Sequence, residues 1–238
     1  MSTPTGNTTL QLWPTPLGVY HWAQASEHNP LLTKVLQSIR FAQTQGNSDG
    51  SSAFFASSDD LLQRIQIPEW AAWLQFLVHA IRDTAAAANA QAWADAGESS
   101  PGMHIRINGL WCQFSNQGVH HDIHTHGNCS WSGVYYVNID PAAQRQAHPQ
   151  LGSTNGVTRF YGPYFNRLGG AHADFGNAYL QQPHIDIAPE PGKLIVFPSW
   201  LPHQAMPYSG EQDRLILSFN ASIDRESGGN QMHGYARA

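Results

Sequence analysis

Histidines are concentrated in one short stretch of this chain, and their spacing suits a metal site. Four of the 13 histidines in the 238 residues fall within seven positions, at His120, His121, His124 and His126. In an extended segment alternate side chains share a face, so His124 and His126 can reach the same ion. His120 and Asp122 have the same spacing. Both pairs are therefore candidates for two ligands of one metal.

A third ligand has to come from elsewhere, and His203 is the candidate. It follows a compact apolar strand in the stretch GKLIVFPSWLPHQAMP, which would present a histidine at the mouth of a barrel. Arg214 opens the later apolar segment RLILSFN and is expected to share one strand face with Ser218. A buried arginine is costly unless it pairs with an anion, and no acidic residue on the adjacent segments is an obvious partner. Arg214 is therefore predicted to bind the carboxylate of a ligand.

The elements that position these residues are predicted to be helices first and strands afterwards. Asn29 and Pro30 are typical of a helix N-cap followed by a proline in the first turn. A second helix is expected from Pro68 to Trp93, ended by Gly97. Short strands separated by Gly, Pro and Asn follow from residue 103, at 132–139, 157–161, 184–188, 194–198 and 215–223.

This order favours a mainly β chain with flanking helices (α+β), whose core is a double-stranded β-helix, the jelly roll of cupin-like proteins. Residues 1–238 are expected to form a single domain, with 1–100 as mostly helical support and 101–238 as the β-helix core. Within that core, 140–183 is predicted to contain a long loop. Its aromatic residues are interpreted as a lid over the site: Phe160, Tyr161, Tyr164 and Phe165.

Composition excludes several classes of function. The chain has 12 Lys+Arg against 17 Asp+Glu, a formal net charge of −5, and such a chain is poorly suited to grip a nucleic-acid backbone. No apolar run approaches the ~20 residues that span a bilayer, and the N-terminus does not resemble a signal peptide. The two cysteines suit a reducing cytoplasm. We therefore expect a cytoplasmic protein without nucleic-acid or membrane partners, and a homodimer as the commonest default.

Three motifs resemble those of the 2-oxoglutarate/Fe(II)-dependent oxygenases of bacteria and their phages: HTHGNCSWSGVYYV, PEPGKLIVFPSWLPHQAMP and RLILSFN. The opening QLWPTPLGVY is also similar to that family. The resemblance implies a double-stranded β-helix in which His124, His126 and His203 hold Fe(II). It also implies that Arg214 binds the distal carboxylate of 2-oxoglutarate and that Tyr136 helps to hold this cosubstrate. Such an enzyme, a hydroxylase in its simplest form, couples decarboxylation of 2-oxoglutarate to oxidation of a small-molecule or peptide substrate.

The chain departs from the family pattern at two positions. The wider superfamily has His-x-Asp or His-x-Glu, whereas His126 stands at the carboxylate position here. Iron is then held by three histidines, unless His120 and Asp122 supply the proximal pair. Many relatives also carry Ser or Thr two residues after the arginine, where this chain has Ile216. Ser218 or Tyr136 is then expected to provide that hydroxyl.

Two other functions fit the same residues. A three-histidine, cupin-like dioxygenase or isomerase would work without 2-oxoglutarate, and Arg214 would bind the carboxylate of its substrate. A non-catalytic module would hold a structural metal, so chelation would lower its thermal stability. Trp131 and Trp200 are predicted either to line a substrate pocket or to pack in the barrel.

Overall fold

The structure is a computed structural model and describes residues 14–44, 52–98, 102–162, 176 and 183–226. Its helices and strands follow one another as β1 (Gly18–His21), α1 (Ala25–Thr44), β2 (Phe54–Ala56), α2 (Leu61–Arg64), α3 (Pro68–Asp95), β3 (Met103–Ser115), β4 (Trp131–Asn138), α4 (Ala142–Gln146), the 3-10 helix η1 (Gly152–Thr154), β5 (Thr158–Tyr161), β6 (His184–Ile187), β7 (Lys193–Pro198), β8 (His203–Ala205) and β9 (Arg214–Arg225).

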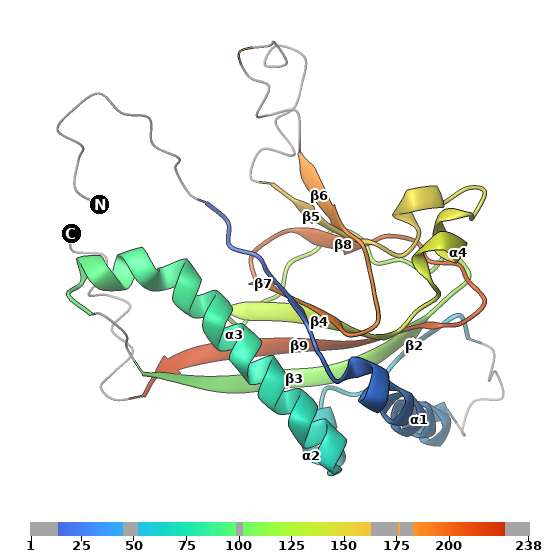
Figure 1. Ribbon diagram of the computed structural model, residues 1–238, viewed down its shortest axis with the longest axis horizontal. Coiled ribbons are helices and arrows are strands. Elements are labelled where there is room, and N and C mark those ends of the chain that lie inside the picture. Colours follow the sequence, from blue (N-terminus) through green and yellow to red (C-terminus); the bar gives the residue numbers. More distant parts are fainter. Residues whose placement is uncertain (1–13, 45–51, 99–101, 163–175, 177–182, 227–238) are drawn as a thin grey trace.

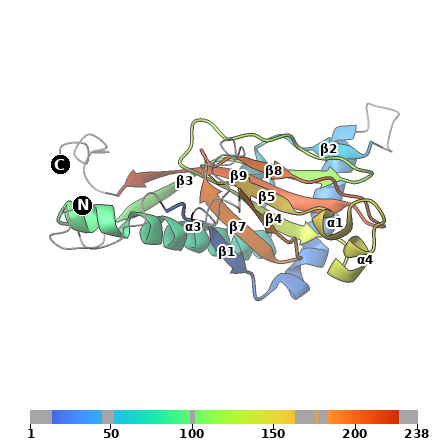
Figure 2. The same cartoon turned by 90° about the horizontal axis from the view of Figure 1, so that it is seen from above.

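Two antiparallel sheets make up the β part of the molecule. The larger sheet has six strands in the order β1-β7-β4-β9-β3-β2, and the smaller has three in the order β6-β5-β8. Helices α1 and α3 lie against one face of the larger sheet, and the smaller sheet lies over the other face (Figure 1). Seen from above, β5 and β8 lie over β4 and β9 (Figure 2). The α+β class and the double-stranded β-helix architecture are confirmed.

The two faces of the larger sheet belong to two separate hydrophobic cores. On β9, Leu215, Leu217 and Phe219 pack with the helices, as alternation along a strand requires. Ile216, between them, packs with Tyr136 and other residues in the core between the sheets. The face on which Arg214 lies is therefore the inner face, toward the smaller sheet.

The predicted strands are confirmed within one or two residues at their ends. The strands β1, β2 and β8 were not predicted. Helix α3 begins at Pro68 as predicted and ends at Asp95, and Gly97 follows with a φ of +79°. Among the described residues, none of the helices has the length and apolar character needed to cross a membrane.

Helix α1 begins earlier than predicted, and Asn29 is not its N-cap. The helix starts at Ala25, and Pro30 lies inside it. The Asn29 side chain is 6% exposed and points to β4 instead. Its Nδ2 donates to the carbonyl of Val137 at 2.8 Å, and its Oδ1 accepts from Tyr135 Oη at 2.7 Å. The prediction was wrong because a buried amide that links a helix to a sheet looks like a cap in the sequence.

The predicted loop 140–183 contains regular structure in its first part. Helix α4, η1 and β5 all fall within it. Phe160 is 5% exposed in the core between the sheets, and Tyr161 Oη donates to Gln204 at 2.6 Å. These two residues therefore belong to the sheet, and their interpretation as a lid was wrong. Tyr164 and Phe165 lie outside the described residues.

Candidate metal centre

The histidines come together because residues 119–126 run antiparallel beside residues 199–208. Val119 pairs with Tyr208, and His124 pairs with His203. The amides of His124 and His203 each donate to the carbonyl of the other at 3.0 Å, and the His126 amide donates to Ser199 at 2.9 Å. Backbone pairing therefore brings His203 next to His124 and His126, between the two sheets.

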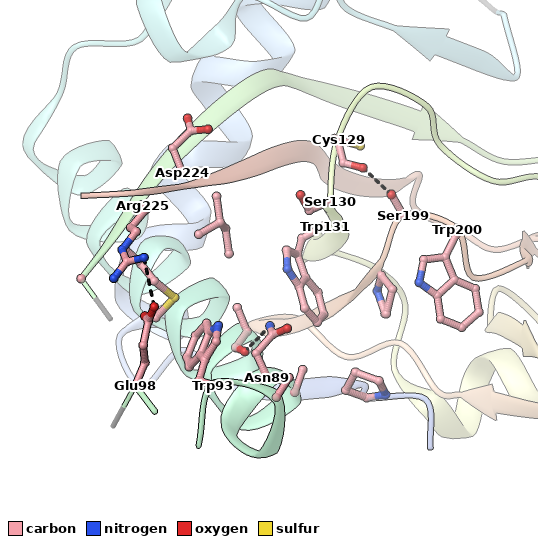
Figure 3. A pocket seen from close by; sticks show the side chains of 18 residues that line it. Asn89, Trp93, Glu98, Cys129, Ser130, Trp131, Ser199, Trp200, Asp224 and Arg225 are labelled. Carbon is pink, nitrogen blue, oxygen red and sulfur yellow. Dashed lines mark hydrogen bonds and ion pairs between the residues drawn. The ribbon is translucent and has the colours of Figure 1, made fainter. Parts of the chain in front are cut away.

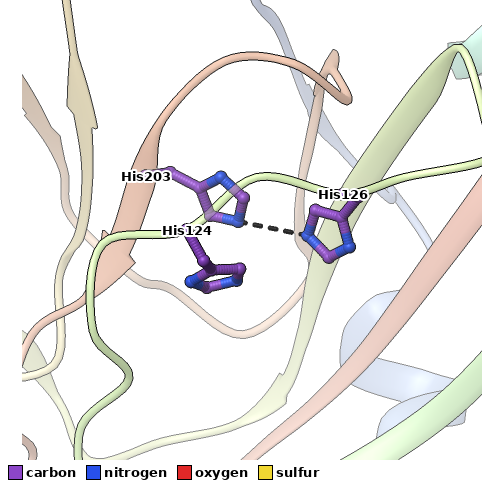
Figure 4. A group of neighbouring side chains, drawn as sticks. All are labelled: His124, His126 and His203. Carbon is purple, nitrogen blue, oxygen red and sulfur yellow. Dashed lines mark hydrogen bonds between the residues drawn. The ribbon is translucent and has the colours of Figure 1, made fainter.

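His124, His126 and His203 form the predicted cluster. One ring nitrogen from each lies within 4.8 Å of the others. Nε2 of His126 and Nε2 of His203 are 3.3 Å apart, and the three rings face a common centre (Figure 4). His203 is 6% exposed, and the other two are partly buried. Three imidazole nitrogens at these separations can all bind one cation.

Backbone carbonyls orient two of these rings. Nδ1 of His124 lies 2.7 Å from the carbonyl of Asp122, and Nδ1 of His203 lies 2.9 Å from that of Leu201. A carbonyl only accepts hydrogen bonds, so each Nδ1 carries the proton and donates it. The Nε2 lone pairs are then left for a metal, which is the arrangement that metal-binding histidines usually have.

The imidazoles of His126 and His203 remain uncharged at neutral pH. Burial, together with the charge of His124, lowers the pKa of His126 to about 4. Burial also lowers the pKa of His203 to about 3, and the neighbouring histidines act in the same direction. Neutral imidazoles bind divalent transition metals, so this donor set fits Fe(II) at physiological pH.

The alternative pair, His120 and Asp122, points away from the cluster. The Asp122 side chain is 97% exposed and that of His120 is 50% exposed, and they face each other across 3.8 Å. The chain bends at Ile123, so strict alternation does not continue from His120 to His126. The geometry therefore brings together the three-histidine set and leaves the His-x-Asp pair outside it.

Arg214 lies on the inner face of β9 and is 2% exposed. Its Nε donates to Ser115 Oγ at 3.0 Å, and one terminal nitrogen approaches the carbonyls of Gly156 and Met206 at 3.4 Å. The Tyr208 ring lies 5.9 Å from the guanidinium carbon. Within the described part of the chain no carboxylate pairs with Arg214, so its charge is buried among neutral groups.

Hydroxyl groups lie near this charge. Tyr136 is 1% exposed, and its Oη is 2.5 Å from Oγ1 of Thr158. Burial raises the pKa of Tyr136, and the charge of Arg214 opposes that shift. Ser218 is 8% exposed on the same strand face as Arg214, with Ile216 between them. Thr158 was not predicted as a site residue, because its contact with β4 is visible only in the fold.

His121 is another residue that sequence reasoning left without a role. Its ring centroid lies 6.1 Å from that of His124 and 5.5 Å from that of Phe54. Burial lowers its pKa, with the charge of Arg214 acting in the same direction. Alternation along the chain placed it on the face opposite His120. Its place in the run of four histidines at 120–126 was the one signal that the sequence offered.

A pocket of about 760 Å³ lies between the C-terminal half of α3 and the ends of β3, β4, β7 and β9. Trp93, Trp131 and Trp200 line it (Figure 3). Trp131 also packs in the helix-side core, whereas Trp200 is 57% exposed. The pocket meets the histidine cluster at Ser199, whose carbonyl accepts the His126 amide. Trp131 and Trp200, the two predicted residues, therefore both line a pocket, and Trp131 also packs in the helix-side core.

Comparison with solved structures shows the shared fold. SnoK, a non-heme alpha ketoglutarate dependent carbocyclase from nogalamycin biosynthesis, aligns with a TM-score of 0.53 at 10% identity, over 94% of this chain and 87% of its own. HygX from Streptomyces hygroscopicus, solved with nickel and 2-oxoglutarate bound, aligns with a TM-score of 0.50 at 11% identity, over 92% and 89% of the two chains. No curated protein sequence matches the chain at a significant level.

A family model provides the assignment. Residues 109–220 match the family described as "Putative 2OG-Fe(II) oxygenase". The match runs from β3 to β9 and includes the three clustered histidines as well as Tyr136 and Arg214. Fe(II) and 2-oxoglutarate are the cofactor and cosubstrate of that family. The segment 109–220, just under half of the chain, therefore matches the 2OG-Fe(II) oxygenase family of enzymes.

Proposed function

We propose that this enzyme binds Fe(II) through His124, His126 and His203, and 2-oxoglutarate through Arg214. It would use them to oxidise a small molecule or a peptide side chain, with hydroxylation as the simplest outcome. The observation that carries the proposal is a buried arginine that pairs with no carboxylate among the described residues, on the sheet face that looks toward the three clustered imidazoles. A dicarboxylate could bind a metal on the imidazoles at one end and the guanidinium of Arg214 at the other.

The three-histidine ligand set has a consequence for charge. Because His126 replaces the usual carboxylate, the protein leaves the full charge of the dication in place. The dianion 2-oxoglutarate would balance that charge, with Arg214 at its far end. Bound Fe(II) and 2-oxoglutarate supply the oxidising chemistry, and the chain supplies orientation and exclusion of water.

The hydroxyl pair of Tyr136 and Thr158 complements Arg214. Each hydroxyl carries one proton, and only one of the two protons can lie in the hydrogen bond between them. The second proton is left to donate to an anion held by Arg214. We propose Tyr136 as a cosubstrate-binding residue, helped by Thr158, in place of the hydroxyl that Ile216 lacks. Ser218 remains a further candidate.

The remaining expectations follow from charge and packing. The negative net charge speaks against a nucleic-acid substrate, and a homodimer is the default assembly. We propose a single domain, because α1 and α3 share a core with the sheet that carries Arg214. A cytoplasmic location is in keeping with two free cysteines, Cys112 and Cys129.

Replacement of Arg214 by alanine tests the assignment. We expect Arg214→Ala to abolish conversion of 2-oxoglutarate to succinate while iron content stays near one per chain, because Arg214 is not among the clustered histidines. His126→Ala should lose iron as well as turnover. Arg106→Ala, at an arginine whose side chain is 60% exposed, is the matched control and should leave both unchanged.

Two results would contradict the proposal. Succinate formation by Arg214→Ala at the wild-type rate would remove Arg214 from the cosubstrate site. Oxygen consumption by the iron-loaded wild type without any dependence on 2-oxoglutarate would favour the three-histidine dioxygenase, an alternative that the absence of a carboxylate at His126 supports.

A further inference from the structure

His121 lies beside Arg214 through two independent connections. Its amide donates to the carbonyl of Ala205 at 3.1 Å, and Arg214 binds the next carbonyl along, that of Met206. Its ring packs edge-on against Phe54, which is the cross-strand partner of Ser115. Ser115 in turn accepts the hydrogen bond from Nε of Arg214. Segments on both sides of Arg214 therefore hold His121 in place.

The same imidazole also faces the histidine cluster. Its ring centroid is 6.1 Å from that of His124 in an edge-on arrangement. His121 is thus placed between the two groups that would hold the ends of 2-oxoglutarate. Its neighbour His120 points outward and is 50% exposed.

The ring nitrogens of His121 are available to a ligand. The side chain is partly buried, yet no group in the described part of the chain forms a hydrogen bond with either nitrogen. Neither ring nitrogen is among the fully buried, unpartnered side-chain atoms of the described residues, so both are accessible to a ligand. An imidazole carries at least one N–H in either charge state, so His121 can donate a hydrogen bond to an anion.

We infer that His121 is a further cosubstrate-binding residue, whose N–H donates to the carboxylate that Arg214 holds. This inference rests on the proposed function. It gives the distal carboxylate donors from two sides, with Tyr136 on β4 and Thr158 on β5, and His121 on the segment that carries His124 and His126. Nothing in the sequence pattern singles out His121 for this role.

Calorimetric titration of 2-oxoglutarate into the anaerobic Fe(II)-loaded protein tests the inference without turnover. Loss of a hydrogen bond to a charged group weakens binding by roughly tenfold or more. We expect His121→Ala to raise the Kd for 2-oxoglutarate by about that factor. 2-Oxobutyrate, which has the same 2-oxo acid end and no distal carboxylate, should bind wild type and His121→Ala equally.

Conservative and neighbouring variants serve as controls. His121→Asn and His121→Gln place an amide N–H near the positions of Nδ1 and Nε2, and one of them should recover most of the affinity. His120→Ala should bind 2-oxoglutarate as the wild type does. Iron content and melting temperature, measured on every variant, identify any loss that comes from misfolding, and the two amide variants then decide.

The outcomes separate this inference from the proposed function. Unchanged affinity of His121→Ala for 2-oxoglutarate would overturn the inference alone. An equal loss of affinity for 2-oxoglutarate and 2-oxobutyrate would overturn the contact with the distal carboxylate. A wild-type protein that binds iron and no 2-oxoglutarate would instead overturn the proposed function.

Discussion

At the scale of single residues, the candidate site depends on short contacts that fix each functional side chain in one orientation. The carbonyls of Asp122 and Leu201 hold the rings of His124 and His203. Ser115 holds the Nε edge of Arg214, which leaves the terminal nitrogens of the guanidinium toward the inner core. Orientation of this kind lowers the entropy that a ligand would otherwise lose on binding.

The contact between Ser115 and Arg214 leads to a prediction. Ser115→Ala removes the acceptor at 3.0 Å, so the buried guanidinium should lose orientation. We expect 2-oxoglutarate to bind roughly tenfold more weakly, with iron content unchanged. Equilibrium titration checks this, and Ser38→Ala, at an exposed serine of α1, is the control. An unaltered Kd would show that Arg214 is held sufficiently by the strand itself.

Sequence spacing together with the family resemblance named His124, His126, His203 and Arg214, with His120 and Asp122 left open as an alternative proximal pair. His-x-His and an arginine that opens an apolar strand can be read in a few residues. Ser115, Thr158 and His121 could not be found in this way. Their contacts cross between strands or segments far apart in the chain, and register decides them.

At the scale of elements, the link between α1 and β4 is a buried polar one. Asn29 bonds both Val137 and Tyr135 where the surroundings are otherwise apolar. The sequence showed the amphipathic pattern of α1 and misplaced its start, because Asn-Pro also occurs at helix caps. The choice between the two readings depended on a sheet that no local pattern reveals.

Removal of the Asn29 side chain should destabilise the protein. Asn29→Ala leaves the Val137 carbonyl and the Tyr135 hydroxyl without their buried partner, which costs about 2–4 kcal/mol. Tyr135→Phe removes one of the two bonds and should cost less. Urea unfolding of both variants and of the double variant measures the coupling. Strict additivity would indicate that the two side chains act independently.

The pair Arg159–Asp186 joins β5 to β6 and gives a pH dependence. Two bonds of 2.7 and 2.8 Å connect the side chains, and they lower the pKa of Asp186 below its usual range. The lowered pKa means that the contribution to stability is present above the unfolded pKa of about 3.9 and is lost as pH falls through the folded value.

Asp186→Asn should therefore lower the free energy of unfolding by about 0.5–1 kcal/mol at pH 7. The difference from wild type should shrink as pH falls below about 3.9. Denaturant unfolding over this pH range measures it. Asp83→Asn, at an exposed aspartate of α3, should show neither effect. A difference that persists at the lowest pH would point to packing rather than to charge.

At the scale of the whole molecule, one hydrophobic core packs the helices on the larger sheet and a second core lies around the candidate site. The helix-side core carries α1 and α3, and the core between the sheets surrounds the candidate site. The order of helices and strands was sufficient to predict this class of fold. The strand order in the larger sheet was not predictable, since non-consecutive strands such as β7 and β4 pair only in the folded protein.

Ligands that bind only the folded protein should raise its stability. A ligand at 100 times its Kd contributes about 2.7 kcal/mol, which corresponds to a rise of roughly 5–10 °C in Tm for a chain of this size. We expect Fe(II) and 2-oxoglutarate to raise the Tm of wild type stepwise under anaerobic conditions. Arg214→Ala should keep the step with iron and lose the step with 2-oxoglutarate. Two steps of wild-type size in that variant would contradict its role.

The reciprocal amide bonds between His124 and His203 bear on how the enzyme is supplied with metal. These two residues are 79 positions apart, yet sheet pairing rather than a metal closes the distance between them. The entropy of closing so long a loop is thus met when the chain folds. When a chelator or oxidation removes the iron, the three histidines should stay in place. Iron should then bind again without refolding of the chain. Cellular activity of such an enzyme would then follow the supply of free iron within the lifetime of a single molecule.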